Sequence, residues 1–112
     1  MDSKEIKVFE RIIEHVHSII EETQDINDAE EFNATNDKSK AALFDLLQIG
    51  ELIQNGLSKE TIQQIDTIPW RQIYALRNRI VHGYASVDYQ IIWETITEDI
   101  PKLEEELEDI LK

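Results

Sequence analysis

Apolar residues recur at steps of three and four along most of the chain, the spacing that places them on one face of an α-helix. A first helix is predicted over residues 3–24, where acidic residues lie between the apolar ones. Its apolar face consists of Ile6, Phe9, Ile13, Val16 and Ile20. The following residues, 25–37, are polar and rich in turn formers, so they predict a connection that includes a helical turn around Ala29–Phe32.

A second helix is predicted from Asn36 or Asp37, either of which can cap it, to about Asn55. Gly56 follows as a typical helix end. The apolar face of this helix consists of Leu43, Leu46, Leu47, Gly50 and Ile53. Because Gly50 has no side chain, a neighbouring helix can approach closely there.

Two further helices are predicted in the middle of the chain. Ser58 opens a short one, and Pro69 opens a longer one that ends at Gly83. Proline suits the first turn because the N–H that it lacks has no partner there. The longer helix has an apolar face of Ile73, Leu76 and Ile80.

A last helix is predicted over residues 88–112, and Pro101 within it should kink it or divide it in two. No stretch alternates with period two, and the chain holds only 3 Gly and 2 Pro. These patterns predict an all-α fold, an up-and-down bundle of four to five helices. A length of 112 residues suits a single domain, residues 1–112.

Composition removes several classes of function. The chain has no cysteine, which excludes disulfides, thiolate metal sites and cysteine nucleophiles. The first residues do not resemble a signal peptide, and no run of about 18 apolar residues occurs, so we expect a cytoplasmic protein without a membrane span. His15 and His17 lie two apart on a helix and therefore cannot share a metal ion. We expect neither a metal nor a cofactor.

The charge is strongly segregated along the chain. The net charge of −13 should repel nucleic acid. Residues 67–87, however, contain no acid and three of the four arginines, Arg71, Arg77 and Arg79, together with His82. A guanidinium group suits phosphate because it donates two parallel hydrogen bonds. The alternative is that these arginines pair with acids on neighbouring helices.

Residues 77–84 carry the most informative group of side chains. Asn78 and His82 are four apart, so the amide of Asn78 could orient the imidazole. Arg77 and His82 are five apart, or about 140° around an ideal helix, and do not point the same way. Either Arg77 reaches around, or the helix opens at Gly83, or a second chain completes the site. At a helix C-terminus, the dipole favours the protonated imidazolium.

Arginine, histidine and a phenol are the groups that metal-free RNA cleavage uses. The RNA 2′-OH attacks its own adjacent phosphate. A histidine moves protons, an arginine stabilises charge on the phosphoryl oxygens, and a tyrosine positions the phosphate. An arginine and a histidine on one helix are nevertheless often structural, so the motif alone does not decide between these interpretations.

The order Arg77-x4-His82-x-Tyr84 matches the Arg-x4-His-x-Tyr motif of the HEPN superfamily. With the flanking Pro69-Trp70-Arg71 and Trp93-Glu94-Thr95, the chain closely resembles the HepT toxin family over nearly its whole length. The resemblance implies a small all-helical ribonuclease, the toxin of a prokaryotic toxin–antitoxin pair. It also implies a homodimer in which the two motifs face each other.

By the same resemblance, Arg77 and His82 are the catalytic pair, supported by Asn78 and Arg79. Tyr84 is the residue that the antitoxin, an MntA-like minimal nucleotidyltransferase, modifies by adenylylation. The implied partners are therefore RNA, a second copy and this antitoxin.

Two alternatives remain open at this point. One is a catalytically silent HEPN module that binds a nucleotide or a partner and accompanies a nucleotidyltransferase. The other is a helical dimerisation bundle. Trp70 and Trp93 could stack on bases, but core or interface anchoring is the commoner use of such side chains.

Overall fold

The computed structural model describes residues 2–83 and 86–112. This part of the chain is all-helical, as the sequence predicts, and contains five helices. In chain order they are α1 (Ser3–Thr23), α2 (Asp37–Gly56), α3 (Lys59–Gln64), α4 (Trp70–His82) and α5 (Tyr89–Ile110).

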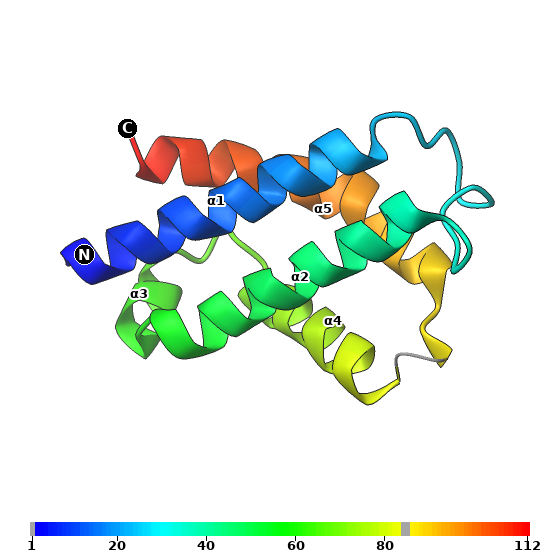
Figure 1. Ribbon diagram of the computed structural model, residues 1–112. Coiled ribbons are helices and arrows are strands. Elements are labelled where there is room, and N and C mark those ends of the chain that lie inside the picture. Colours follow the sequence, from blue (N-terminus) through cyan, green and yellow to red (C-terminus); the bar gives the residue numbers. More distant parts are fainter. Residues whose placement is uncertain (1, 84–85) are drawn as a thin grey trace.

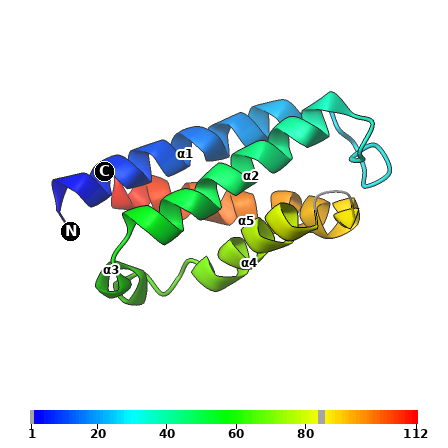
Figure 2. The same cartoon turned by 60° about the horizontal axis from the view of Figure 1, so that its bottom comes forward.

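The four long helices run alternately up and down (Figure 1). α1 packs against α2 and α5, and α2 packs against α4. In Figure 2, α1 and α2 form one layer, with α4 and α5 beneath it. The short α3 lies at the end of the bundle where α2 turns towards α4. This order leaves α4 on the side of the bundle remote from α1.

The predicted helix boundaries agree with the structure because the capping residues form the expected hydrogen bonds. The side chain of Asn36, not that of Asp37, accepts from the backbone N–H groups of Lys38 and Ser39. Ser58 caps α3 and Asp88 caps α5 in the same way. Such bonds satisfy N–H groups that lack a partner in the first helical turn.

The buried face of α1 is rotated from the predicted one. Phe9 and Val16 are fully buried as expected, but the other buried apolar residues of α1 are Ile12 and Ile19. Ile6, which was predicted on this face, is 40% exposed. α1 contacts two helices, and its buried stripe is therefore set by the groove between α2 and α5 rather than by the most regular apolar spacing.

The structure decides between the two predicted effects of Pro101 only in part: α5 continues through it as one helix from Tyr89 to Ile110 and is not divided. Pro101 is exposed, so the groups freed by its missing N–H face solvent. Residues 24–36 form turns and bends, and one of the turns covers residues 29–31, within the predicted Ala29–Phe32. Side-chain hydrogen bonds of Asn33 and Asn36 hold this connection.

Both tryptophans anchor the bundle. Trp70 is buried at the start of α4, and its indole N–H donates to the carbonyl of Ile65 at 2.8 Å. Trp93 packs against the core, with its ring 5.4 Å from that of Phe32. Trp70 is buried and Trp93 is partly buried against the core, as the anchoring interpretation predicts.

A polar group lies between α1 and α2. His15 Nδ1 lies 2.8 Å from Asp45 Oδ1, and Asp45 is buried. Burial, with the hydrogen bonding and negative charge of Asp45, raises the pKa of Glu22 to about 7. Glu22 Oε2 is itself buried and has no hydrogen-bond partner within the described residues.

No helix in the described ranges has the length and apolar character needed to cross a membrane.

Candidate functional site

The candidate site is carried by α4. Trp70, Ile73, Leu76 and Ile80 face the core and fix the rotation of this helix. Asn78 and His82 therefore lie on the side away from the core, whereas Arg77 lies on the flank of α4 that faces α2. α4 ends regularly, since the backbone N–H of Gly83 donates to the carbonyl of Arg79 at 3.0 Å.

Arg77 forms an ion pair with Glu51 of α2. Its Nε donates to Glu51 Oε1 at 2.6 Å, and its Nη2 contacts the same oxygen. The guanidinium also lies 5.8 Å from the ring centre of Tyr74. The two paired side chains are 22% and 36% exposed, so the pair lies at the surface but is partly shielded from water. The alternative that arginines pair with neighbouring acids thus holds for Arg77.

Gly50 makes this approach of α2 and α4 possible. A Cβ atom placed on Gly50 would lie 2.4 Å from the Cβ of Arg77 and 2.6 Å from its Cγ. Only a residue without a side chain leaves room for the stem of Arg77. The prediction that Gly50 permits a close helix approach is confirmed.

Asn78 contacts Arg77 rather than His82. The side-chain oxygen of Asn78 accepts a hydrogen bond from Arg77 Nη1 at 2.9 Å. No hydrogen bond links Asn78 to His82, so the expected orientation of the imidazole by this amide is wrong for the present conformation. Asn78 instead helps to fix the guanidinium.

The guanidinium of Arg77 keeps hydrogen-bonding capacity. Arginine has five N–H donors. Glu51 and Asn78 engage Nε and one hydrogen on each Nη nitrogen. Among the described residues, nothing accepts from the second N–H of Nη1 or from the second N–H of Nη2. These two N–H groups can therefore donate to phosphate oxygens.

His82 is exposed at the last position of α4. It lines a shallow groove of about 350 Å³ together with Arg79, Gly83, Ser86, Val87 and Asp88. The Asp88 carboxylate accepts from backbone N–H groups at the start of α5 and is therefore engaged as a cap. The C-terminus of α4 carries negative partial charge, so the attraction of this groove for an anion comes from Arg79 and His82 and not from the helix dipole.

The geometry narrows the three explanations for the separation of Arg77 and His82. Arg77 does not reach around the helix, because Glu51 and Asn78 hold it. α4 ends at His82, and the hydrogen bond from Gly83 to Arg79 is intact, so opening at Gly83 and completion by a second chain both remain possible explanations. Tyr84, the third member of the motif, lies outside the described residues.

Arg71 and Arg79 are exposed, and neither forms an ion pair with another residue in the described ranges. The two side chains occupy different surroundings. Arg79 lines the groove of His82 and also a second groove against α5. Arg71 lies near the start of α4, in a hollow beside α2 and α3.

The two neighbouring histidines of α1 face different helices, as their spacing predicts. His15 contacts Asp45 of α2, and His17 Nε2 lies 3.2 Å from Glu104 Oε2 of α5. Ligand atoms of His17, Glu104 and Glu108 lie within 4.8 Å of one another and could hold a divalent cation. None of these three residues belongs to α4, so this group is separate from the candidate site.

Sequence reasoning missed Glu51 as the partner of Arg77. One signal was available: Glu51 directly follows Gly50, the residue expected at a close helix contact. Residues 38–66 also contain only four acids, which made each a distinctive candidate. Choosing Glu51 among them required the register between α2 and α4.

Comparison with known proteins gives consistent matches. The family model described as ribonuclease HepT-like matches residues 9–110. A protein named "Putative RNase" from Caldanaerobacter subterraneus is 35% identical over 103 residues, covering 92% of this chain and 90% of the relative. Another of that name from Methanocaldococcus jannaschii is 33% identical, covering 100% and 96%. A "Probable ribonuclease HepT" from Thermococcus cleftensis is 32% identical, covering 92% of each. No solved structure matches the chain significantly.

Proposed function

Because the chain belongs to the ribonuclease HepT-like family, we propose that it is a metal-independent endoribonuclease in which Arg77 and His82 carry the chemistry. The observation that carries this proposal is the state of Arg77. Glu51 and Asn78 fix its guanidinium in one orientation, yet two N–H donors remain for an anion. One turn further along the same helix, His82 is exposed and able to exchange protons.

The reaction that suits these groups is an internal transesterification of RNA. The 2′-oxygen forms a bond to the adjacent phosphorus and loses its proton to solvent. The bond from phosphorus to the 5′-oxygen of the next nucleotide breaks, and protonated His82 gives that oxygen a proton. Arg77 stabilises the charge that develops on the phosphoryl oxygens. The products are a 2′,3′-cyclic phosphate and a free 5′-hydroxyl.

A homodimer with facing motifs is part of this proposal. Phe44 and Val81 are 58% and 45% exposed. Phe44 is seven residues from Glu51 on α2, and Val81 is four residues from Arg77 on α4, so each shares a helix face with one member of the ion pair. A second copy that covers these apolar side chains would bring its own motif to the same place.

The proposed biological role is that of a toxin in a toxin–antitoxin system of the cytoplasm. Its antitoxin would be an MntA-like nucleotidyltransferase that adenylylates Tyr84 and so blocks RNA binding. Tyr84 comes two residues after His82 in the sequence. A bulky anionic group attached to Tyr84 would therefore be an effective block to RNA binding. Co-expression with such a partner should add adenylyl mass to the wild type and to Tyr74→Phe, but not to Tyr84→Phe.

The central test is cleavage of total RNA by unmodified protein in excess chelator. Wild-type protein and His17→Ala, which removes an exposed histidine of α1, should cleave. His82→Ala should not, while its melting temperature stays within about 2 °C of the wild type because His82 is exposed. Equal cleavage by His82→Ala would refute the assignment. Absence of cleavage by all three would favour the silent binding module.

The composite site has a separate test by complementation. Arg77→Ala and His82→Ala should each be inactive alone. If Arg77 of one copy acts with His82 of the other, a mixture of the two variants regains activity, because one of the two sites in a mixed dimer is intact. Phe44→Glu should dissociate the dimer in sedimentation, whereas Ile6→Glu, a change at another exposed apolar residue on α1, should not. An inactive mixture of stable mixed dimers would contradict a shared site.

A further inference from the structure

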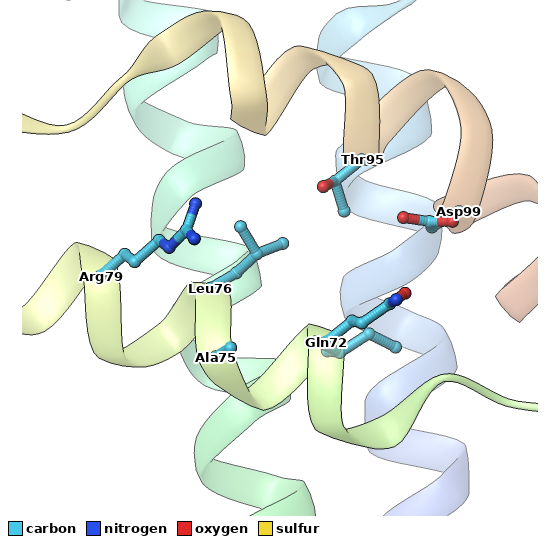
Figure 3. A pocket seen from close by; sticks show the side chains of 7 residues that line it. Gln72, Ala75, Leu76, Arg79, Thr95 and Asp99 are labelled. Atoms are coloured by element: carbon cyan, nitrogen blue, oxygen red, sulfur yellow. The ribbon is translucent and has the colours of Figure 1, made fainter.

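A second groove lies beside the candidate site, between α4 and α5. It has a volume of about 230 Å³ and receives the polar side chains of Gln72, Arg79, Thr95 and Asp99. Figure 3 shows the guanidinium of Arg79 at one end and the Asp99 carboxylate with the Gln72 amide at the other, with Leu76 between them. The two ends therefore offer opposite hydrogen-bonding chemistry across an apolar floor.

The charged groups of this groove are not used by the fold. Within residues 2–83 and 86–112, neither Arg79 nor Asp99 forms an ion pair or a side-chain hydrogen bond, although both face the same space. Thr95, by contrast, donates its hydroxyl to the carbonyl of Ile91 at 3.3 Å. Arg79 and Asp99 thus border one groove without pairing with each other. They suit a ligand that has hydrogen-bond acceptors at one edge, for Arg79, and donors at the other edge, for Asp99.

The floor of the groove suits a flat, partly apolar ligand. Ile73 and Leu76 are buried residues of α4 that also line the groove, so the floor is held rigidly by the core. Sites for small organic groups commonly combine such an apolar surface with a few convergent polar groups. A nucleobase fits this description better than a phosphate, because Asp99 would repel an anion.

Arg79 connects this groove to the groove of His82. It lines both, and His82 lies three residues further along α4, or about 4.5 Å along the helix axis. A nucleotide with its base between Arg79 and Asp99 would therefore have its sugar and phosphate directed towards His82.

We propose that the groove between α4 and α5 binds a guanine base and makes RNA cleavage guanine-selective. Guanine presents the acceptors O6 and N7, which a guanidinium contacts in a bidentate manner. Its N1–H and N2 amino group can both donate to a carboxylate. Arg79 and Asp99 provide these two complements. This inference rests on the proposed ribonuclease function for its biological meaning. Guanine binding can nevertheless be measured whether or not the protein cleaves RNA.

The other bases match less well. Adenine has an amino donor where guanine has O6 and lacks a hydrogen on N1. Inosine keeps O6, N7 and N1–H but lacks the amino group. The expected order of binding is therefore guanine, then inosine, then adenine.

Binding can be measured without cleavage by using the His82→Ala protein. The probes are fluorescent pentaribonucleotides of sequence UUGUU, UUIUU and UUAUU, in which I is inosine. Their binding is measured by fluorescence anisotropy at fixed salt concentration. Guanine should bind roughly tenfold or more tightly than adenine, the range that one bidentate base contact provides. Equal binding of the three probes would overturn the proposal.

Asp99→Asn in the same background should abolish most of the preference for guanine over inosine, since an amide cannot accept from two donors as a carboxylate does. Glu98→Gln is the matched control, because it removes the same charge from the adjacent, exposed position of α5. It should leave the ratio unchanged. Equal loss in both variants would mean that general charge, not the groove, determines the preference.

The two proposals fail in different ways. Cleavage of RNA without selectivity for guanine, together with equal binding of the probes, would overturn the subsite and leave the ribonuclease standing. Guanine-selective binding with no cleavage by the wild type would overturn the ribonuclease and leave the subsite standing as part of a nucleotide-binding module.

Discussion

Glu51 on α2 accepts a hydrogen bond from Nε of Arg77 on α4 at 2.6 Å, in a position that Gly50 alone makes accessible. A surface ion pair of this kind contributes little to folding, typically below about 1 kcal/mol. Together with Asn78, however, it holds the guanidinium in one orientation and leaves two of its five N–H donors without a partner among the described residues. The pair is therefore better understood as a device that positions Arg77 than as a source of stability.

Replacing Glu51 with Gln should weaken catalysis more than folding. The guanidinium would lose a charged partner and sample other orientations, so we expect kcat to fall about 10- to 100-fold with KM nearly unchanged. Unfolding free energy should fall by about 1 kcal/mol or less. Initial rates on a short RNA substrate and a urea unfolding curve measure the two effects.

Glu10→Gln is the control for that change, because it removes the same charge from an exposed position of α1. It should alter neither rate nor stability. A Glu51→Gln enzyme with the wild-type rate would mean that Asn78 and Tyr74 position Arg77 without help.

Gly50→Ala should disturb both the fold and the site. The new methyl group would overlap the Cβ of Arg77, an atom close to the backbone that cannot move without α4. Overpacking of this kind costs about 1–3 kcal/mol, and the displacement of Arg77 should abolish activity. Thermal unfolding and the RNA assay measure these losses. Gln54→Ala, an exposed change on the same helix, should leave both intact, and a stable, active Gly50→Ala protein would contradict the close contact.

The helices themselves could be predicted because each signal for them is local. A capping residue such as Asn36 and an apolar repeat lie within one segment, so no knowledge of neighbours is needed. The buried face of α1 could not be predicted as well. Ile6 and Ile12 are equally apolar, and which of them is buried depends on where α2 and α5 lie.

The sequence motif nominates Arg77 and His82 as candidate site residues, but it does not predict their contacts. The motif placed Arg77 and His82 on one helix by counting along the sequence. The partner of Arg77 comes from another helix, and Asp99 of α5 borders the same groove as Arg79 only because of how the helices are arranged. Such pairings depend on the register between helices, which a single sequence does not determine.

Pro101→Ala should stabilise the protein without changing its activity. Pro101 lies inside α5, where it cannot donate to the carbonyl of Thr97, and it is exposed. Alanine restores that hydrogen bond, and we expect a gain of about 1–3 kcal/mol in unfolding free energy. Lys102→Ala, the adjacent exposed change, should have an effect within about 0.5 kcal/mol. A loss of stability in Pro101→Ala would show that the packing of α5 requires the bend that proline favours.

Glu22→Gln should make the protein more stable above neutral pH. Because the pKa of Glu22 rises from 4.5 to about 7 on folding, the folded state binds more protons between those pH values, and this group lowers stability as the pH rises through them. Above pH 7 the buried charge faces the Asp45 carboxylate, and Gln removes it. We expect a gain on the order of 1 kcal/mol at pH 8, allowing for solvent screening, and almost none at pH 4.5. Urea unfolding at both pH values, with the exposed Glu14→Gln as control, measures the difference. The same gain at both pH values would exclude titration of Glu22 as its cause.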